Sequence, residues 1–518
     1  MRNTSLPISL SITSGLVADY VQRKSGLDDL IQVAPDLPSI QEYASRRQLD
    51  PEVRKTLCQV LEEQYASVEM SPETRKNLDL LKREETVTVT TGHQICLLTG
   101  PFFSISKIAS AIALARQVSS AVPVFWMATE DHDFEEINHV EIFGKRVSWD
   151  QPSGAPVGRM LTASIETFLS EVEELFGPGQ LNPAWIEKWR SAYAHDHLAN
   201  ATRQLFNDLF GHLGLVILDA DDARLKVHFS EIIAKELSGS FSEHAMLATN
   251  RNLESMGYKA QVTPRDINLF MVLDGVRQRI TRNRNGVATA DESAKWTEQE
   301  LMEWLQQHPG DFSPNVVLRP VYQECILPNV AYIGGPGEVA YWLQLKDVFQ
   351  EAGINLPAIV LRDHFVPVSK AVSRKMESLG LEDSDIFKDP QEVIQHLLQD
   401  EHMDWREDEE AYAKWWEHVI ARFIGLDPTL AKAAEAEKTK AENGFRRLQD
   451  KAARAVRSNH ETTVNKVNAI HSSLFPEGAP IERVANLFQF APEDPVELID
   501  FMVETCAPTR HLIHVIRI

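Results

Sequence analysis

The alternation of apolar and polar positions between Thr86 and Gln117 predicts a strand, a loop and a helix in succession. Residues 86–90 read T-V-T-V-T, which is the period of a β-strand. Gly92 and the pair Gly100-Pro101 then interrupt the pattern, as loop residues do. After them, apolar residues recur at helical spacing on one face: Ile105, Ile108, Ile112 and Ala115.

The first turn of this predicted helix carries Ser104, Ser106 and Lys107. Backbone N–H groups collect at a helix start without partners in the helix itself, and they attract anions. We therefore expect an anion to bind there.

A second unit of the same kind follows. Residues 123–128 are continuously apolar, as in a buried parallel strand, and they run into the acidic stretch 129–136. Two parallel strands joined by a helix place both following loops at one edge of the sheet, where open α/β sheets bind ligands. The glycine loop and the acidic loop are expected to share one crevice.

The remaining pattern predicts an interrupted α/β core. We expect residues 1–80 to be a helical segment that packs on the core, and 81–220 to be the first part of the core, with a helical insertion near 145–213 and a further strand at Leu215–Asp219. Residues 221–312 resemble an insertion with strands of its own. Its arginines 277, 279 and 282 suit a carboxylate or phosphate, and the alternative is a solvated hairpin.

The sheet is predicted to resume in residues 313–385. Strand-like stretches occur at Val316–Pro320, Ala331–Ile333 and Ala358–Asp363, and Arg362 stands near the end of the last one. A second glycine loop, Gly334-Gly335-Pro336-Gly337, precedes the helical pattern Val339–Phe349.

Residues 386–510 are predicted to be a helical coiled-coil domain, followed by a tail or strand at 511–518. Spacing of three and four residues from Leu430 to Leu474 predicts one helix about 65 Å long, with Asn459 at the seam. The alternative to coiled-coil pairing is an antiparallel hairpin within the chain, with Glu497–Val503 as its other arm.

Composition narrows the class of protein. A chain of 518 residues favours two or three domains, and a net charge of −23 argues against a nucleic-acid-binding protein. No window approaches a membrane span, so we expect a cytoplasmic protein. The four cysteines include no C-x-x-C pair, which argues against disulfides and structural zinc. Cys96, in the first loop, is either a nucleophile or a small buried residue.

Three long stretches resemble the bacillithiol-biosynthesis cysteine-ligase family (BshC). They are TGHQICLLTGPFFSISKIASAI at 91–112, PVFWMATEDHDFEEINHV at 123–140 and RPVYQECILPNVAYIGGPGEVAYWLQLK at 319–346. The resemblance implies a nucleotidyl-transferase-like Rossmann core with connecting-peptide insertions and a C-terminal coiled coil that forms a homodimer. It also implies a ligase that joins cysteine to the amine of glucosaminyl-malate.

Amide formation from a carboxylate requires activation, because oxide is a poor leaving group. ATP is therefore the expected cosubstrate, with a cysteinyl-adenylate as the simplest intermediate, and its phosphate needs cations or N–H donors. His93 and Lys107 match this need as catalytic residues, although His93 could also be a packing histidine. The binding residues expected in this loop are Thr91, Gly92, Gln94 and Gly100.

The acidic loop suits other tasks. Glu130 and Asp131 are expected to be catalytic and Asp133 and Glu135 to bind substrate, by holding an ammonium, accepting a proton or binding Mg²⁺ with phosphate. No H-E-x-x-H spacing supports zinc, and a solvated acidic turn is the alternative. Further expected binding residues surround the second glycine loop: Gly334, Gly335, Gly337, Glu338, Tyr341 and Arg362.

Two other functions remain open at this point. One is a nucleotidyl or sugar transferase with a different acceptor. The other is a non-catalytic coiled-coil dimer that binds a nucleotide or thiol and organises enzymes of the same pathway.

Overall fold

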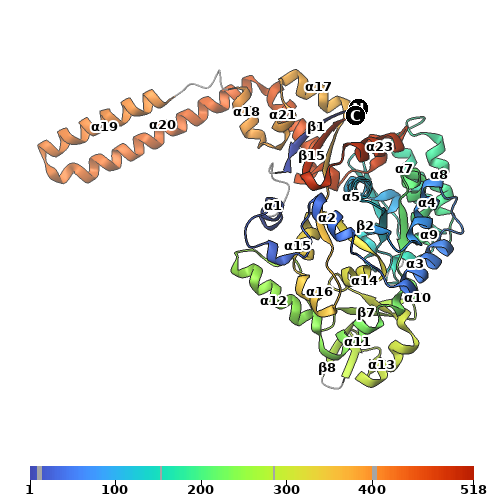
Figure 1. Cartoon of the computed structure of the whole chain (residues 1–518). Coiled ribbons are helices and arrows are strands. Elements are labelled where there is room, and N and C mark those ends of the chain that lie inside the picture. The colour runs from blue at the N-terminus through green and yellow to red at the C-terminus, as the bar shows by residue number, and fades with distance from the viewer. Residues whose placement is uncertain (9–14, 152–153, 284–285, 399–404) are drawn as a thin grey trace. The chain divides into compact units, whose positions relative to one another are not determined.

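The computed structural model describes residues 1–8, 15–151, 154–283, 286–398 and 405–518, with the side chains of 456, 457 and 459 left aside. The chain divides into two compact units (Figure 1). The first comprises Met1–Val368 and Ala479–Ile518, and the second comprises Ser369–Gly478. The helical unit thus begins earlier and ends earlier than the expected 386–510, because the chain after residue 478 returns to the first unit.

The centre of the first unit is a five-stranded parallel sheet in the order β13-β12-β2-β3-β6. Its strands are β2 (Val87–His93), β3 (Ala121–Met127), β6 (Val216–Asp219), β12 (Asn329–Gly334) and β13 (Ala358–Leu361). Counted along the chain, this is the order 5-4-1-2-3 of a Rossmann sheet, which confirms the expected α/β core. Nearly every residue of these strands is buried, because helices cover both faces.

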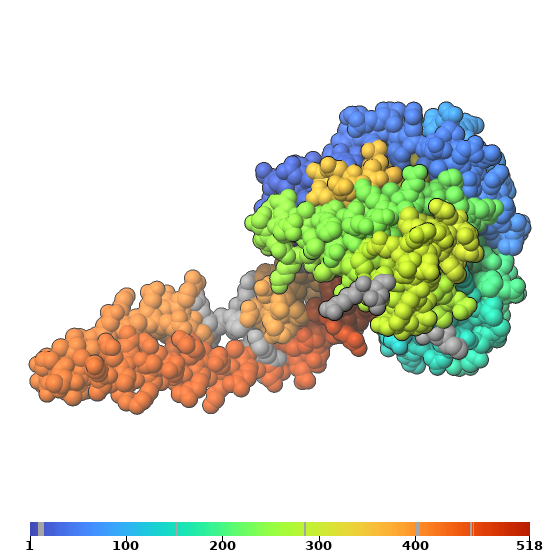
Figure 2. Space-filling view, turned by 90° about the horizontal axis from the view of Figure 1, so that it is seen from below, coloured from blue at the N-terminus to red at the C-terminus, as the bar shows by residue number. Residues whose placement is uncertain are grey.

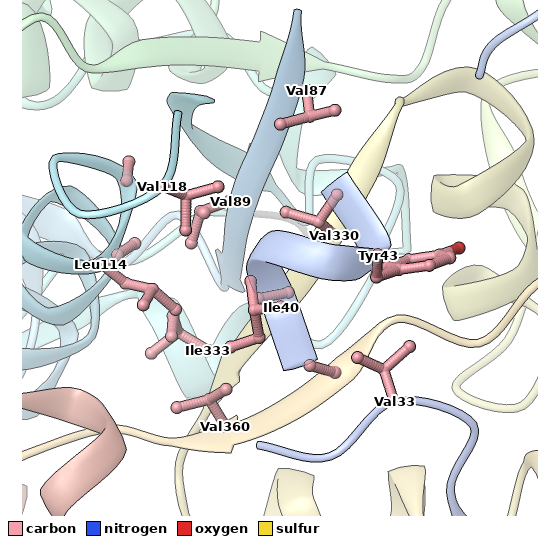
Figure 3. Packing of buried hydrophobic residues seen from close by; sticks show 14 residues of the cluster. Val33, Ile40, Tyr43, Val87, Val89, Leu114, Val118, Val330, Ile333 and Val360 are labelled. Carbon is pink, nitrogen blue, oxygen red and sulfur yellow. The ribbon is translucent and has the colours of Figure 1, made fainter. Parts of the chain in front are cut away.

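The packing of one face of this sheet is seen in Figure 3. Side chains of β2, β12 and β13 meet Ile40 and Tyr43 of α2 and Leu114 of α5. Burial of this many aliphatic groups, at roughly 1.5–3 kcal/mol each, supplies much of the stability of the core.

The helices of the first unit are α1 (Gly15–Val21), α2 (Leu37–Ala44), α3 (Pro51–Gln64), α4 (Pro72–Leu81), α5 (Phe102–Ala115), α6 (Phe134–Ile137), α7 (Glu166–Phe176), α8 (Pro183–Tyr193), α9 (Leu198–Phe210), α10 (Ala223–Val227), α11 (Ser230–Gly239), α12 (Phe241–Ser255), α13 (Glu298–Gln307), α14 (Arg319–Ile326), α15 (Pro336–Trp342), α16 (Lys346–Ala352), α22 (Leu487–Phe490) and α23 (Pro495–Thr505).

The predicted insertion carries its own antiparallel sheet in the order β10-β9-β8-β7-β11. Its strands are β7 (Leu269–Leu273), β8 (Val276–Asn283), β9 (Gly286–Thr289), β10 (Lys295–Trp296) and β11 (Phe312–Pro314). Figure 2 shows this yellow region beside the green helical segment that precedes it, on one face of the first unit. The hairpin of β7 and β8 turns at Asp274-Gly275, where both residues have positive φ.

Two further strand groups were not fully expected. The N-terminal strand β1 (Arg2–Pro7) lies in the segment predicted to be helical, and it pairs with β15 (Leu512–Arg517), which in turn pairs with β14 (His364–Val368). A short hairpin joins β4 (His139–Ile142) to β5 (Lys145–Ser148).

The predicted strand at Val316–Pro320 is wrong. Asn315 Oδ1 accepts hydrogen bonds from the amides of Val317 and Leu318 at 2.8 and 3.4 Å, which starts a helical turn. Pro320 then stands in the first turn of α14, a position that proline favours. An apolar run of this length is ambiguous between strand and helix, and the asparagine decides it.

The second unit contains α17 (Lys370–Leu379), α18 (Pro390–Leu397), α19 (Arg406–Leu426), α20 (Ala431–Asn459) and α21 (Glu461–Leu474). The single long helix predicted from 430 to 474 is interrupted at His460, where the apolar spacing skips. α20 pairs with α19 as a hairpin: Gln449 Nε2 donates to Glu409 Oε1 at 2.8 Å, and Phe445 contacts Trp405 and Tyr412. The expected seam residue Asn459 lies outside the described side chains.

The other arm of the hairpin is therefore α19, and the expected Glu497–Val503 is wrong in this role. Those residues belong to α23 in the first unit, which packs against α5 and α9. Among the described residues, no helix is both long enough and apolar enough to cross a membrane.

Candidate active site

The strands β2 and β12 are neighbours at the centre of the sheet, and the chain order reverses between them. In an open α/β sheet this reversal point opens a crevice at the carboxyl ends of the strands. β2 ends at His93 and β12 ends at Gly334, so the two predicted glycine loops meet there. Thr91 joins the strands, because its hydroxyl donates to the carbonyl oxygen of Ile333 at 2.8 Å.

Lys107 lies at this point but is not a free cation. Its ammonium group is buried, donates to the carbonyl oxygen of Gly92 and lies 2.6 Å from Glu338 Oε2. Burial lowers the pKa of Lys107, whereas Lys107 lowers the pKa of Glu338 against the effect of burial. The pair therefore ties α5 to α15, and the bond to Gly92 adds the end of β2.

At the start of α5, where we expected an anion, two of the backbone amides have partners within the protein. The amide of Phe102 donates to the carbonyl oxygen of Ala485 at 2.8 Å, and that of Ser104 donates to Pro101 at 3.0 Å. A backbone carbonyl from the C-terminal segment thus occupies the amide of Phe102, which sequence periodicity could not reveal.

His93 is an unsatisfied group in the crevice. Its Nε2 atom is buried and has no hydrogen-bond partner within the described part of the chain. Burial and the nearby Lys107 lower the pKa of His93 to about 3, so the ring is neutral at physiological pH. The ring lies edge-on to Phe103, with 5.0 Å between centroids. A neutral imidazole here can exchange hydrogen bonds with a ligand.

A cavity of about 430 Å³, which we call the His93 cavity, opens beside this ring. Its lining residues are His93, Gln94, Cys96, Gly100, Pro101, Phe103, Glu136, His139, Val140, Glu141, Arg483 and Val484. Gly100 has φ +65°, and a Cβ there would lie 2.5 Å from Cys96 Cβ, so the turn requires glycine. Burial raises the pKa of Cys96 to about 12, which favours a buried residue over a nucleophile.

A second cavity of about 530 Å³, which we call the arginine cavity, lies between the carboxyl edge of the parallel sheet and the insertion. Four arginines line it, together with Gln94 after β2, three residues of the acidic loop and Asn315 after β11: Arg265, Arg277, Arg279, Arg319, Gln94, Glu130, Asp131, His132 and Asn315. Gln94 lines both cavities, so the two meet at this side chain.

The four arginines differ in how they are held. Arg277 is buried and donates to Ser313 Oγ at 3.0 Å, to His132 Nδ1 at 2.9 Å and to the carbonyl oxygen of Pro314 at 3.2 Å. Arg319 lies 3.4 Å from the hydroxyl of Tyr341. The guanidinium groups of Arg265 and Arg279 form no hydrogen bond or ion pair with another described residue, which leaves their donors for a ligand. Arg282 instead binds Glu298 and the carbonyl oxygen of Leu237.

In the acidic loop, only part of the expected set reaches a cavity. Glu130 is buried and lies 2.7 Å from Lys226 Nζ; burial raises its pKa. Asp131 accepts from Gln94 Nε2 at 2.6 Å, and Arg277 lowers the pKa of Asp131 against the effect of burial. Asp133 and Glu135 are exposed and line neither cavity. The alternative of a solvated turn fits these last two.

Lys226 also belongs to a wider buried network. It lies 2.7 Å from Asp221, which pairs with Arg159 at 2.7 Å. Lys226 and Arg159 lower the pKa of Asp221 to about 2 against the effect of burial. Within the described chain, no group of three or more His, Cys, Asp or Glu side chains is arranged to hold a metal ion.

The second glycine loop is held by hydrogen bonds between neighbouring residues of the same segment. Glu338 Oε2 accepts from the amide of Gly335 at 2.9 Å, and Oε1 accepts from Tyr332 at 2.5 Å. Nothing lies within 4 Å of a Cβ placed on Gly337, and Tyr341 is buried against Arg319. Arg362 donates two hydrogen bonds to Glu482, at 2.9 and 2.7 Å. These bonds occupy the terminal guanidinium nitrogens of Arg362, which we expected to bind substrate.

Sequence reasoning missed lining residues such as Arg319 and Arg483, and the charged partners Glu482 and Lys226 of expected site residues. Arg319 stands in one of the three quoted family stretches, so its position there was an available signal. Arg483 and Glu482 follow the helical unit in sequence and carry no local pattern, and Lys226 lies in the short helix α10. Only the folded chain brings these three to the crevice.

Known proteins resemble this chain over its whole length. The family model "Bacillithiol biosynthesis BshC, N-terminal Rossmann-like domain" matches residues 1–363, and the BshC C-terminal coiled-coil domain matches residues 365–518. A Flavobacterium johnsoniae protein named "Putative cysteine ligase BshC" is 34% identical over 98% of this chain and 97% of its own length. A Cytophaga hutchinsonii protein of that name is 35% identical over 96% and 95%, and one from Bacillus cereus is 27% identical over 97% and 98%.

Proposed function

The chain belongs to the BshC family of bacillithiol biosynthesis, and from this membership we propose that it is the ligase that joins cysteine to the amine of glucosaminyl-malate. One observation carries the proposal: two cavities on the carboxyl edge of a Rossmann sheet share Gln94 as a common wall. Condensation of two substrates needs two subsites that meet at the reacting atoms, and this arrangement supplies them.

The arginine cavity suits the malate end of the acceptor. Malate carries two carboxylates, and guanidinium groups bind carboxylates with paired hydrogen bonds. Arg265, Arg279 and Arg319 present such groups to the cavity. Glu130 lines the same cavity, and its raised pKa suits a group that takes the proton from the attacking amine.

The His93 cavity suits cysteine and the activating nucleotide. ATP, when bound, supplies a phosphate leaving group for the carboxyl carbon of cysteine. The neutral His93 ring offers its unpaired Nε2 to a ligand oxygen. Asp131, in the adjoining arginine cavity, offers a carboxylate to an ammonium at Gln94, where the two cavities meet. Mg²⁺ would be held mainly by phosphate oxygens and water, with Asp131 or Glu136 beside it.

The test compares cells that carry wild type, a deletion, His93→Ala or the control His244→Ala, an exposed histidine of α12. Bacillithiol and glucosaminyl-malate are measured by mass spectrometry, and protein levels by immunoblot. We expect the deletion and His93→Ala to lose bacillithiol and accumulate the precursor, and His244→Ala to match wild type. Unchanged thiol in the deletion would refute the proposal. Pyrophosphate release that ignores cysteine would favour another transferase.

We also propose a cytoplasmic homodimer formed through α19 and α20. These helices expose large apolar side chains, among them Trp415, Leu426 and Leu448 at 54%, 81% and 61% exposure. Such a surface is typical of an interface. Light scattering should give twice the chain mass for wild type and for the first-unit control Val276→Glu, and the single-chain mass for Leu448→Glu. A monomeric wild type would refute the dimer.

A further inference from the structure

Arg362 is held from two sides at the carboxyl end of β13. Its two terminal nitrogens donate to Glu482, and one of them also donates to the carbonyl oxygen of Asp363 at 2.9 Å. Both side chains of this ion pair are buried, with 3% and 2% exposure. The terminal nitrogens therefore have little capacity left for a ligand.

The remaining donor of Arg362 is its Nε–H group. This nitrogen is buried and has no hydrogen-bond partner in the described residues. It lies 3.8 Å from the position of a Cβ built on Gly335, in the loop after β12. The guanidinium lies 5.7 Å from the ring of Phe103, which lines the His93 cavity. A buried charged donor without a partner is costly, so this N–H is suited to a ligand at the switch point.

Glu482 is itself fixed by further contacts. Its Oε1 lies 2.9 Å from His364 Nδ1, and its Oε2 accepts from the amide of Phe365 at 3.2 Å. The next two residues, Arg483 and Val484, line the His93 cavity. The segment that follows the helical unit therefore lines the His93 cavity through Arg483 and Val484, and holds Arg362 through Glu482.

We propose that Glu482 is a positioning residue, which holds Arg362 so that its Nε–H donates to an oxyanion at the edge of the His93 cavity, beside Phe103. The oxyanion is either a phosphate of the nucleotide or a carboxylate of a substrate. The proposal deepens the proposed function because it concerns the same crevice. It is tested by binding, so its failure is separate from a failure to make bacillithiol.

The experiment is calorimetric titration of the full-length protein with three probes in turn: Mg²⁺-ATP, L-cysteine and L-malate. The variants are Arg362→Lys, Glu482→Gln, Glu482→Asp and the double variant Arg362→Lys/Glu482→Gln. Glu236→Gln is the matched control, because Glu236 is equally buried and hydrogen-bonded but lies in the insertion. Circular dichroism verifies folding, and Glu482→Asp keeps the charge if Glu482→Gln does not fold.

We expect Arg362→Lys to weaken one probe by about tenfold or more, since a hydrogen bond to a charged group has this strength. Glu482→Gln and Glu482→Asp should weaken that same probe, and the double variant should bind it no more weakly than Arg362→Lys. The affected probe then identifies phosphate or carboxylate as the ligand group. Additive effects would overturn the proposal, since they indicate a structural role independent of Arg362. Unchanged affinity in both Glu482 variants, or a wild type that binds none of the probes, would also overturn it.

Discussion

Glu338 Oε2 lies 2.6 Å from Lys107 Nζ, and Lys107 is only 1% exposed. The pair joins α5 to the start of α15 across the switch point of the sheet. Breaking a buried ion pair from one side leaves an uncompensated charge, whereas removing both charges does not. The two residues should therefore behave as a unit in stability measurements.

Lys107→Met is expected to lower the free energy of unfolding by about 3–5 kcal/mol, measured by urea denaturation. The double variant Lys107→Met/Glu338→Gln should recover most of this loss, because glutamine removes the charge and keeps an oxygen for the Gly335 amide or the Tyr332 hydroxyl. Lys55→Met, which removes an exposed ion pair with Glu52, should cost less than about 1 kcal/mol. A loss in Lys107→Met as small as that of the control would show that the pair is not buried as described.

His93 should contribute to the acid sensitivity of folding. Its folded pKa of about 3 lies below the ordinary value of 6.5, so below pH 6.5 the unfolded chain takes up a proton that the folded chain refuses. Stability is lost as the pH falls from 6.5 towards 3. Between pH 7 and pH 5, wild type should lose about 2 kcal/mol more than His93→Gln. Parallel pH profiles of the two proteins would contradict this burial of His93.

Asn486 should hold the loop before α5. Its Nδ2 donates to the carbonyl oxygens of Leu98 and Gly100 at 2.7 and 2.8 Å. Leu98, Thr99 and Gly100 all have positive φ, so the loop depends on outside partners. Asn486→Asp keeps the shape but removes both donors, and it should cost about 2–3 kcal/mol.

Hydrogen-exchange mass spectrometry of Asn486→Asp should show faster exchange in peptides that cover residues 95–104. Peptides from the insertion serve as the internal control and should exchange as in wild type. Equal protection of the loop in the two proteins would mean that Asn486 does not restrain it.

Two arginines of β8 should separate ligand binding from structure. Arg279 lines the arginine cavity, whereas Arg282 binds Glu298 and Leu237. Arg279→Ala should weaken malate binding by about tenfold in calorimetry, since a guanidinium-carboxylate bond has this strength. Arg282→Ala should bind malate as wild type does. Weaker malate binding in Arg282→Ala than in Arg279→Ala would show that malate does not bind in the arginine cavity.

Glu324 should make the core less stable at alkaline pH. Burial raises its pKa to about 7 from the ordinary 4.5, so the folded chain retains a proton that the unfolded chain releases. The stabilisation is present below pH 4.5 and is lost as the pH rises to 7. Relative to Glu324→Gln, wild type should lose about 3 kcal/mol between pH 4.5 and pH 8. A constant difference between the two proteins across this range would contradict the raised pKa.

The sequence by itself determined the five strands of the parallel sheet and the carboxyl edge at which the candidate site lies. The alternation at residues 86–90 and the apolar run at 123–128 correspond to β2 and β3, because period and burial are local properties of a strand. The glycines after β2 and β12 marked the two loops that meet. The three long family stretches indicated the family that the whole-chain matches show.

Only the tertiary structure decided which polar groups are available to a ligand. A sequence gives the type of each side chain, but the tertiary fold decides which distant residue that side chain contacts. Lys107 and Arg362 look equally open in sequence, yet one is paired with Glu338 and the other with Glu482, 120 positions later. The tertiary fold also leaves Asp133 exposed to solvent and places Arg279 in the lining of the arginine cavity. Periodicity reads one segment at a time, so it cannot report which distant residue neutralises a charge.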